Sequence, residues 1–195
     1  YKDMTFDVEE YYKKAADWAA KVVLNLEQTT YSFSDNLESI YDVENPTGPE
    51  HIFIMSMDRT GASEGQYSKI SKMYIPYVAG GTIYLKNEDG SLSATHDGWG
   101  EYRTTKEFYD SFESGDKRHD ELIVSEVYNK EGEVIADYKA DGSGKLAYPF
   151  CRKFIDPSFV GDKTSTRPYL IRFSDIALTY AEAAGPTTES YALVN

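Results

Sequence analysis

The chain has 195 residues, a net charge of −13 and an aromatic content of 14%, with 17 Tyr against 9 Phe and 2 Trp. Its length is sufficient for one domain with a sizeable hydrophobic core. An acidic surface repels phosphate backbones and anionic lipid headgroups, which makes nucleic acid a poor partner and argues against a polybasic membrane patch. No apolar run approaches the ~20 residues that a membrane-spanning helix needs.

The first predicted element is an amphipathic helix over residues 7–26. Asp7 and Glu10 have the spacing of a capping box, with Asp in place of Ser or Thr. Apolar side chains then recur in steps of three and four, which predicts one buried stripe along the helix. The stripe consists of Tyr12, Ala15, Ala16, Ala19, Val22, Val23 and Leu26.

The next part of the chain combines short elements with a long irregular segment. Residues 37–41 predict a helical turn and residues 51–57 a short strand. Residues 58–100 show no strong periodicity, and a segment of this length is usually functional or disordered. Its density of aromatic residues argues against disorder. Within it, residues 83–86 and the turn at Asn87–Gly90 predict a small hairpin.

Two further local patterns follow in the second half. Thr104 and Glu107 form a capping box before a helix that Gly115 ends. Residues 122–128 and 133–138 alternate apolar and polar side chains around a turn, which predicts a β-hairpin. Cys151 is the single cysteine, so a disulfide within the chain is impossible, and its strand-like surroundings indicate a buried structural thiol.

The last predicted element is a helical hairpin over residues 168–195. Pro168 suits the first turn of a helix, Gly185 is a stop signal, and Thr187 or Thr188 can cap a second helix. Two short helices joined by a tight turn form an αα-hairpin. The stripe of the first helix comprises Leu170, Phe173, Ile176, Ala177, Tyr180, Ala181 and Ala184.

Signals for catalysis are poor. His51, His96 and His119 are scattered, and no metal-ligand, nucleophile-elbow or phosphate-binding motif occurs. We therefore expect no enzyme activity, no metal and no cofactor. A glycoside hydrolase stays open as an alternative, because two carboxylates ~5 Å or ~6.5–9.5 Å apart across one cleft would support it.

Aromatic side chains in the glycine-rich middle are the best candidates for ligand contact. An aromatic ring packs against the axial C–H groups of a sugar, while loops on a rigid scaffold commonly carry binding residues. Trp99 stands between two glycines, and in the opposite interpretation it fills the junction between this loop and the helix of Phe108. The predicted glycan-stacking residues are Trp99, Tyr102, Tyr84, Tyr77 and Tyr74.

Four ordered blocks resemble the SusD/RagB family. Residues 172–183 read Arg-Phe-Ser-Asp-Ile-Ala-Leu-Thr-Tyr-Ala-Glu-Ala, similar to a family signature near the C-terminal end. Residues 98–118 begin Gly-Trp-Gly and end Gly-Asp-Lys-Arg, departing from the family only by Arg-Thr in place of Pro-Thr at the helix start. Residues 153–156 and the tetratricopeptide-type helix at 11–23 complete the set.

The resemblance implies a mainly α fold with tetratricopeptide-like helix pairs, a loop-rich part and short β-hairpins. We expect one SusD-like domain over residues 1–195, truncated at both ends, with helical parts at 7–26 and 168–195. The ligand-bearing part would be 42–166.

The function implied is that of a surface lipoprotein of the outer membrane in Bacteroidota. Such a protein captures an oligosaccharide or polysaccharide for nutrient uptake and delivers it to a SusC-like TonB-dependent transporter. Its lipid anchor would lie outside this chain. The alternative is a helical-repeat module that captures peptide, as in the RagB branch. Exposed aromatics on loops favour glycan, whereas aromatics lining a helix groove favour peptide.

Overall fold

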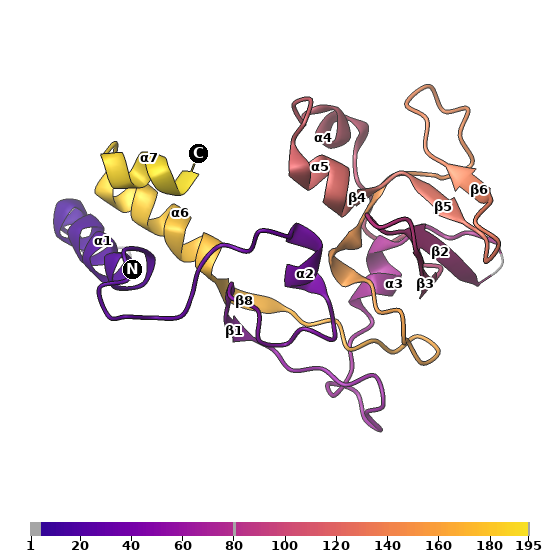
Figure 1. The fold of residues 1–195 in the computed structure, drawn as a ribbon, viewed down its shortest axis with the longest axis horizontal. Coiled ribbons are helices and arrows are strands. Elements are labelled where there is room, and N and C mark those ends of the chain that lie inside the picture. Colours follow the sequence, from indigo (N-terminus) through magenta and orange to yellow (C-terminus); the bar gives the residue numbers. More distant parts are fainter. Residues whose placement is uncertain (1–4, 80, 195) are drawn as a thin grey trace. The chain divides into compact units, whose positions relative to one another are not determined.

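The computed structural model describes residues 5–79 and 81–194 and divides into two compact units (Figure 1). The helical unit comprises the chain up to Asp35, Thr47–Ile54 and the chain from Tyr169. The sheet unit comprises Asn36–Pro46 and Met55–Pro168. The expected single domain over 1–195 stays a prediction. Residues 1–4, 80 and 195 lie outside the described part of the chain.

Helix α1 (Val8–Val23) opens the helical unit at the predicted cap. The Asp7 carboxylate accepts a hydrogen bond from the Glu10 backbone N–H at 3.0 Å, which satisfies one free donor of the first turn. α1 packs against α6 (Phe173–Ala184). The predicted stripe is wider than this contact: Ala19 is buried, whereas Tyr12 is 45% exposed. Small alanines let the two helices approach along a narrow line that leaves the larger side chains at its edges.

The predicted helix start at Pro168 is wrong. Residues Tyr169–Arg172 form strand β8, which pairs antiparallel with β1 (His51–Ile54), and the helix α6 begins only at Phe173. The Arg172 N–H donates to the Asp175 carboxylate at 2.8 Å and so closes the first turn. Pairing with a distant strand overrides the local helical pattern, because it satisfies the backbone groups of these residues equally well.

The end of α6 follows the prediction. Gly185 has φ 72°, a conformation that glycine adopts without strain, and the helix stops there. The Thr187 hydroxyl accepts a hydrogen bond from the Ser190 N–H at 3.1 Å and caps α7 (Thr188–Val194). The predicted αα-hairpin is therefore confirmed for the described residues.

The sheet unit is built on a four-stranded antiparallel sheet in the order β3–β2–β5–β6. Both predicted hairpins are present, although the second begins later than predicted, because Leu122 ends a helical turn and Ile123–Val124 pair with a different strand. The first joins β2 (Thr82–Lys86) to β3 (Leu92–His96), and the second joins β5 (Glu126–Tyr128) to β6 (Val134–Asp137). A separate pair joins β4 (Ile123–Val124) to β7 (Phe150–Cys151).

Short helical turns make up the rest of the regular structure in the sheet unit. Thr105, one residue after the predicted cap, accepts a hydrogen bond from the Phe108 N–H, and the helix that follows is shorter than predicted. The five turns are α2 (Leu37–Tyr41), α3 (Ile70–Tyr74), α4 (Lys106–Asp110), α5 (Lys117–Leu122) and the 3₁₀ turn η1 (Arg152–Phe154).

One face of the sheet carries the hydrophobic core. The strands alternate in burial, so that Ile83 and Leu85 point into the core while Tyr84 points to the other face. Burial raises the pKa of the Cys151 thiol beside this core, as expected for a structural cysteine. The core residues are Ile75, Val78, Ile83, Leu85, Val127, Ala136, Leu146, Tyr148, Phe150 and Ile155.

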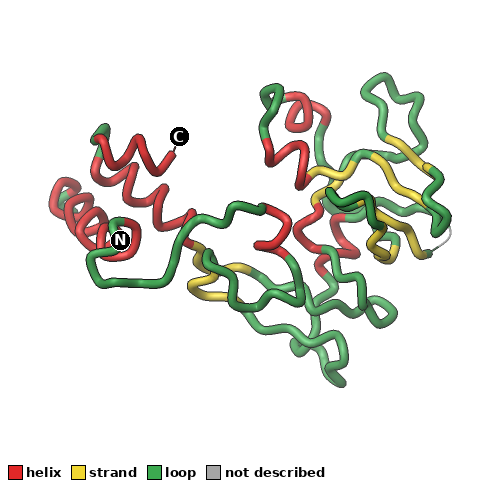
Figure 2. The backbone as a smooth tube through the Cα atoms, in the orientation of Figure 1, coloured by secondary structure: helices red, strands yellow, loops and turns green. Residues whose placement is uncertain are grey.

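The expectation of a mainly α fold needs correction. The structure is a mixture of helices and small sheets, and the long helices α1 and α6 belong to the helical unit alone (Figure 2). β-Branched residues of the middle, such as Ile83, Thr95 and Val127, lie in paired strands, where such side chains pack well. In the part of the chain that the structure describes, no helix is long and apolar enough to cross a membrane.

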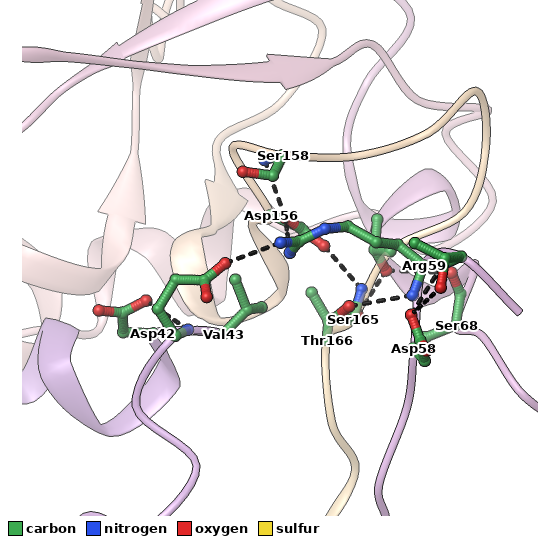
Figure 3. Close-up of polar contacts among 12 residues, drawn as sticks. Asp42, Val43, Asp58, Arg59, Ser68, Asp156, Ser158, Ser165 and Thr166 are labelled. Atoms are coloured by element: carbon green, nitrogen blue, oxygen red, sulfur yellow. Dashed lines mark hydrogen bonds and ion pairs between the residues drawn. The ribbon is translucent and has the colours of Figure 1, made fainter.

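A buried carboxylate ties together the loops of the sheet unit. Asp156 is fully buried, and its two oxygens accept hydrogen bonds from the Arg59 guanidinium at 3.0 Å and the Ser165 N–H at 2.6 Å (Figure 3). The Ser158 N–H adds a third bond at 2.9 Å. These hydrogen bonds hold the loop of residues 156–166 against the chain at Arg59. The Arg59 guanidinium also pairs with the exposed Glu44 carboxylate.

Candidate functional site

Most of the predicted aromatic residues lie on two segments whose backbones are hydrogen-bonded to each other. One segment is residues 97–102, and the other is α3 with the residues that follow it. The Trp99 N–H donates to the Lys72 carbonyl at 2.6 Å, and the Tyr102 N–H donates to the Met73 carbonyl at 2.9 Å. Between them, the Gly100 N–H donates to the Ile75 carbonyl at 3.2 Å. These bonds satisfy the backbone of an irregular segment and fix where its side chains emerge.

The two glycines around Trp99 are required by packing. A Cβ atom on Gly98 would lie 1.7 Å from the Ile75 carbonyl oxygen, so no other residue fits this backbone approach. Gly100 has φ 69°, and a Cβ there would lie 3.1 Å from the Tyr148 hydroxyl. Gly98 therefore allows the close contact with Ile75, the residue after α3, and Gly100 the contact with Tyr148, while the Trp99 side chain between them is exposed.

Four of the five predicted rings lie on these two segments, and we call this set of residues the aromatic shelf: Tyr74, Tyr77, Trp99 and Tyr102. Tyr77 is 74% exposed, Tyr102 56% and Trp99 47%, whereas Tyr74 is half-buried. The Tyr74 and Tyr102 ring centroids are 5.3 Å apart with a 40° angle between the ring planes. On its other contact, Tyr74 stacks with Phe154, which is also half-buried, at a distance of 5.0 Å between the ring centroids.

Tyr84 belongs to a different surface. It lies in β2, opposite Ala94 of β3 and Tyr128 of β5. Strand alternation turns it away from the core face that holds Ile83 and Leu85. Tyr84 therefore lies on a strand outside the two segments that carry the other four candidates.

A buried ionic cluster lies beside Trp99. Lys72 is 8% exposed, and its Nζ lies 3.2 Å from an Asp97 carboxylate oxygen and 3.3 Å from one of Asp162. The same Nζ lies 6.0 Å from the centroid of the Trp99 ring, within the range of a cation–π contact. Neither Lys72 nor Asp162 is indicated by a sequence motif.

His96 completes this buried region. Its Nε2 lies 3.1 Å from the Ser71 hydroxyl and its Nδ1 3.0 Å from the Asp97 carbonyl oxygen, while its ring meets Phe159 edge-on. Burial, and then the Lys72 ammonium, lower the pKa of His96 below its ordinary 6.5. The imidazole is therefore held neutral at physiological pH.

This neutral histidine predicts a loss of stability toward acid. Below pH 6.5 the unfolded chain takes up a proton on His96 that the folded chain resists, so the free energy of unfolding falls as the pH decreases from 7.5 to 5. His96→Gln removes this contribution. The difference in the free energy of unfolding between the parent and the variant should therefore shrink as the pH falls. Urea unfolding at a series of pH values measures it; a difference that stays constant between pH 7.5 and 5 would contradict the prediction.

The sheet unit also contains a polar groove of about 750 Å³ that the sequence did not indicate. The Arg152 guanidinium lies in its wall, donating to the Glu38 carboxylate at 2.7 Å, the Lys86 carbonyl at 2.8 Å and the Asn87 side-chain oxygen at 3.1 Å. These partners occupy the guanidinium. The remaining lining consists of Asn36, Ser39, Tyr41, Asp42, Glu88, Asp89, Ser93, Ile155 and Pro157.

Within the described residues no group of His, Cys, Asp and Glu is arranged to hold a metal ion. The shelf itself offers aromatic faces with hydroxyl and indole N–H groups at their edges. Such a surface can stack against an apolar face of a ligand and hydrogen-bond to its rim.

Comparison with known proteins assigns the chain to a family. The sequence profile of the SusD family matches residues 49–193, most of the chain and all of the aromatic shelf. The chain belongs to the SusD family. No curated protein sequence matches it.

Solved structures of the same superfamily share the fold at low sequence identity. A SusD superfamily protein from Parabacteroides distasonis superposes with a TM-score of 0.65 at 22% identity, covering 96% of this chain and 38% of that one. Surface glycan-binding protein A from Bacteroides uniformis superposes with a TM-score of 0.65 at 17% identity, covering 96% of this chain and 37% of that one.

A third structure was determined with a ligand. Surface glycan-binding protein A from Bacteroides thetaiotaomicron in complex with laminarihexaose gives a TM-score of 0.58 at 15% identity, covering 94% of this chain and 43% of that one. In each of the three comparisons the chain spans less than half the length of its structural relative.

Proposed function

We propose that the chain is the ligand-bearing part of a glycan-capture protein and that the aromatic shelf is its contact surface. The observation that carries the proposal is the exposure of Trp99, Tyr102 and Tyr77 on backbone segments fixed by hydrogen bonds to α3. Rigid, solvent-exposed rings lose little conformational entropy when a ligand stacks on them. Several structural relatives are glycan-binding proteins, among them a laminarin-binding SusD-like protein, and they support glycan as the ligand class.

The proposed action is capture without chemistry. The shelf binds a stretch of oligosaccharide through the faces of its rings, and no residue of the shelf acts on a glycosidic bond. Family membership further supports a place at the cell surface of a Bacteroidota-type bacterium. There the full-length protein would be held by a lipid anchor and would pass its glycan to a SusC-like TonB-dependent transporter.

Binding of oligosaccharides to a Trp99→Ala variant tests the proposal. Laminarin-derived oligosaccharides head a panel of soluble glycans, and calorimetry measures affinity for the parent chain and the variant. Loss of a central aromatic contact commonly costs about 1–2 kcal/mol, so we expect roughly five- to thirtyfold weaker binding of any glycan that the parent binds.

Trp18→Ala is the matched control, because Trp18 is the other tryptophan, is 69% exposed and lies on α1 in the helical unit. We expect its affinity to equal that of the parent. A Trp99→Ala variant that binds glycan normally while melting at a lower temperature would show that Trp99 serves packing, and the proposal for the shelf would be wrong.

A second candidate, peptide capture, is favoured by one observation in the helical unit. A small groove of about 260 Å³ lies between α1 and α6 and is lined by Tyr11, Tyr12 and Ala15 on one side. Thr179, Glu182 and Ala183 line the other side. Aromatics along a helix groove suit an apolar peptide side chain. Binding that is lost in Tyr12→Ala and retained in Trp99→Ala would favour this function over glycan capture.

A further inference from the structure

Lys72 contacts Trp99 in two ways. Its backbone carbonyl accepts the Trp99 N–H at 2.6 Å, and its Nζ lies 6.0 Å from the centroid of the indole. The first contact fixes where the tryptophan backbone lies. The second places a positive charge beside the ring of a side chain that is 47% exposed and would otherwise be free to change rotamer.

The position of the ammonium is itself fixed. Lys72 is 8% exposed, and a buried charge of this kind persists only when it is paired. Asp97 and Asp162 hold its Nζ at 3.2 and 3.3 Å. Two carboxylates on different segments restrict a flexible lysine stem far more than one exposed partner does.

The two carboxylates are in turn anchored through the backbone. The Asp97 N–H donates to the Gly81 carbonyl at 2.7 Å, directly before β2. The loop that carries Asp162 is joined to the residues before α3, because Ser68 and Thr164 exchange backbone hydrogen bonds at 2.9 and 2.8 Å. The ammonium therefore occupies a site that is set by three parts of the sheet unit.

We propose that Lys72, held between Asp97 and Asp162, is a positioning residue that locks the Trp99 indole and leaves one ring face open to the ligand. The locking of the ring rests on the contacts above, whereas the consequence for binding rests on the proposed function of the aromatic shelf. A ring with a fixed orientation binds a flat ligand face without first losing rotamer freedom.

Fluorescence of Trp99 tests the first part. The chain contains two tryptophans, so Trp18→Phe leaves Trp99 as a single reporter. In this background, time-resolved anisotropy reports motion of the indole, and acrylamide quenching reports access to it. Lys72→Met keeps the stem and removes the charge, Lys72→Arg keeps the charge, and Asp162→Asn removes one partner whose side chain is 48% exposed.

We expect Lys72→Met to increase rapid motion of the indole and its quenching, and to weaken binding of the glycan that the parent binds by about two- to fivefold. Lys72→Arg should keep the indole motion, the quenching and the glycan affinity of the parent. Asp162→Asn should show the same changes as Lys72→Met, but smaller ones. If Lys72→Met does not fold, Asp162→Asn carries the test alone. A lowered melting temperature with unchanged anisotropy and quenching of Trp99 would overturn the proposal, because the ionic cluster would then serve stability only.

The same series separates this proposal from the proposed function. If the indole becomes mobile in Lys72→Met but neither this variant nor Trp99→Ala changes glycan affinity, Lys72 positions the ring and the shelf is not the binding site. If Trp99→Ala weakens binding while the indole stays fixed in both Lys72→Met and Asp162→Asn, the shelf binds glycan and Lys72 does not position it.

Discussion

Asp156→Ala should destabilise the sheet unit by about 3–5 kcal/mol, the usual cost of removing one partner from a buried ion pair. The carboxylate is fully buried and accepts hydrogen bonds from Arg59, Ser158 and Ser165. Its removal leaves two backbone N–H groups without their acceptor and a largely covered guanidinium with only the exposed Glu44 as a carboxylate partner. Urea unfolding followed by circular dichroism measures the change.

Glu44→Gln is the matched control for this variant. The Glu44 carboxylate pairs with the same guanidinium at 2.9 Å, but its side chain is 67% exposed. Exposed ion pairs contribute about 1 kcal/mol or less, because water screens them. An equal decrease in the free energy of unfolding for Asp156→Ala and Glu44→Gln would contradict the conclusion that Asp156 holds the loop of residues 156–166 in place.

Gly98→Ala should cost about 3 kcal/mol or more, since the added Cβ would overlap the Ile75 carbonyl oxygen at 1.7 Å and force the two backbone segments apart. The hydrogen bond of Trp99 to Lys72 lies beside this contact, so glycan binding should weaken together with stability. Thermal unfolding and calorimetry on the same protein sample measure the two effects.

Gly90→Ala separates this overlap from ordinary backbone strain. Gly90 has φ 83° with open space around its Cβ position, so alanine there should cost only about 1–2 kcal/mol from the left-handed conformation. It lies in the turn between β2 and β3, and glycan binding should remain unchanged. A Gly98→Ala variant no less stable than Gly90→Ala would mean that the close approach to Ile75 is relaxed in solution.

The elements that the sequence predicted correctly are those whose signals are local. The turn at Asn87–Gly90 and the stop at Gly185 each depend on a few adjacent residues with defined conformational preferences. Residues 169–172 carried an equally regular helical pattern, yet they form a strand. Their partner is His51–Ile54, more than a hundred positions earlier, and no local pattern shows that pairing.

The candidate site shows the same division. The chain order alone placed Trp99 and Tyr102 close together, and glycine content indicated an irregular, exposed segment. Tyr84 could have been separated from them, because a residue in the middle of a predicted strand points to one face of a sheet. The pairing of Lys72 with Asp162 could not have been predicted, since it depends on how a distant loop packs against α3.

The most direct test of the account uses the same two tryptophans as separate reporters. Protein labelled with 5-fluorotryptophan gives one ¹⁹F resonance from Trp99 on the aromatic shelf and one from Trp18 on α1, and Trp99→Phe assigns them. During titration with a glycan that calorimetry shows to bind, the Trp99 resonance should shift with the same dissociation constant while the Trp18 resonance stays in place. Saturation of binding without any movement of the Trp99 resonance would contradict the assignment of the shelf as the glycan-binding surface.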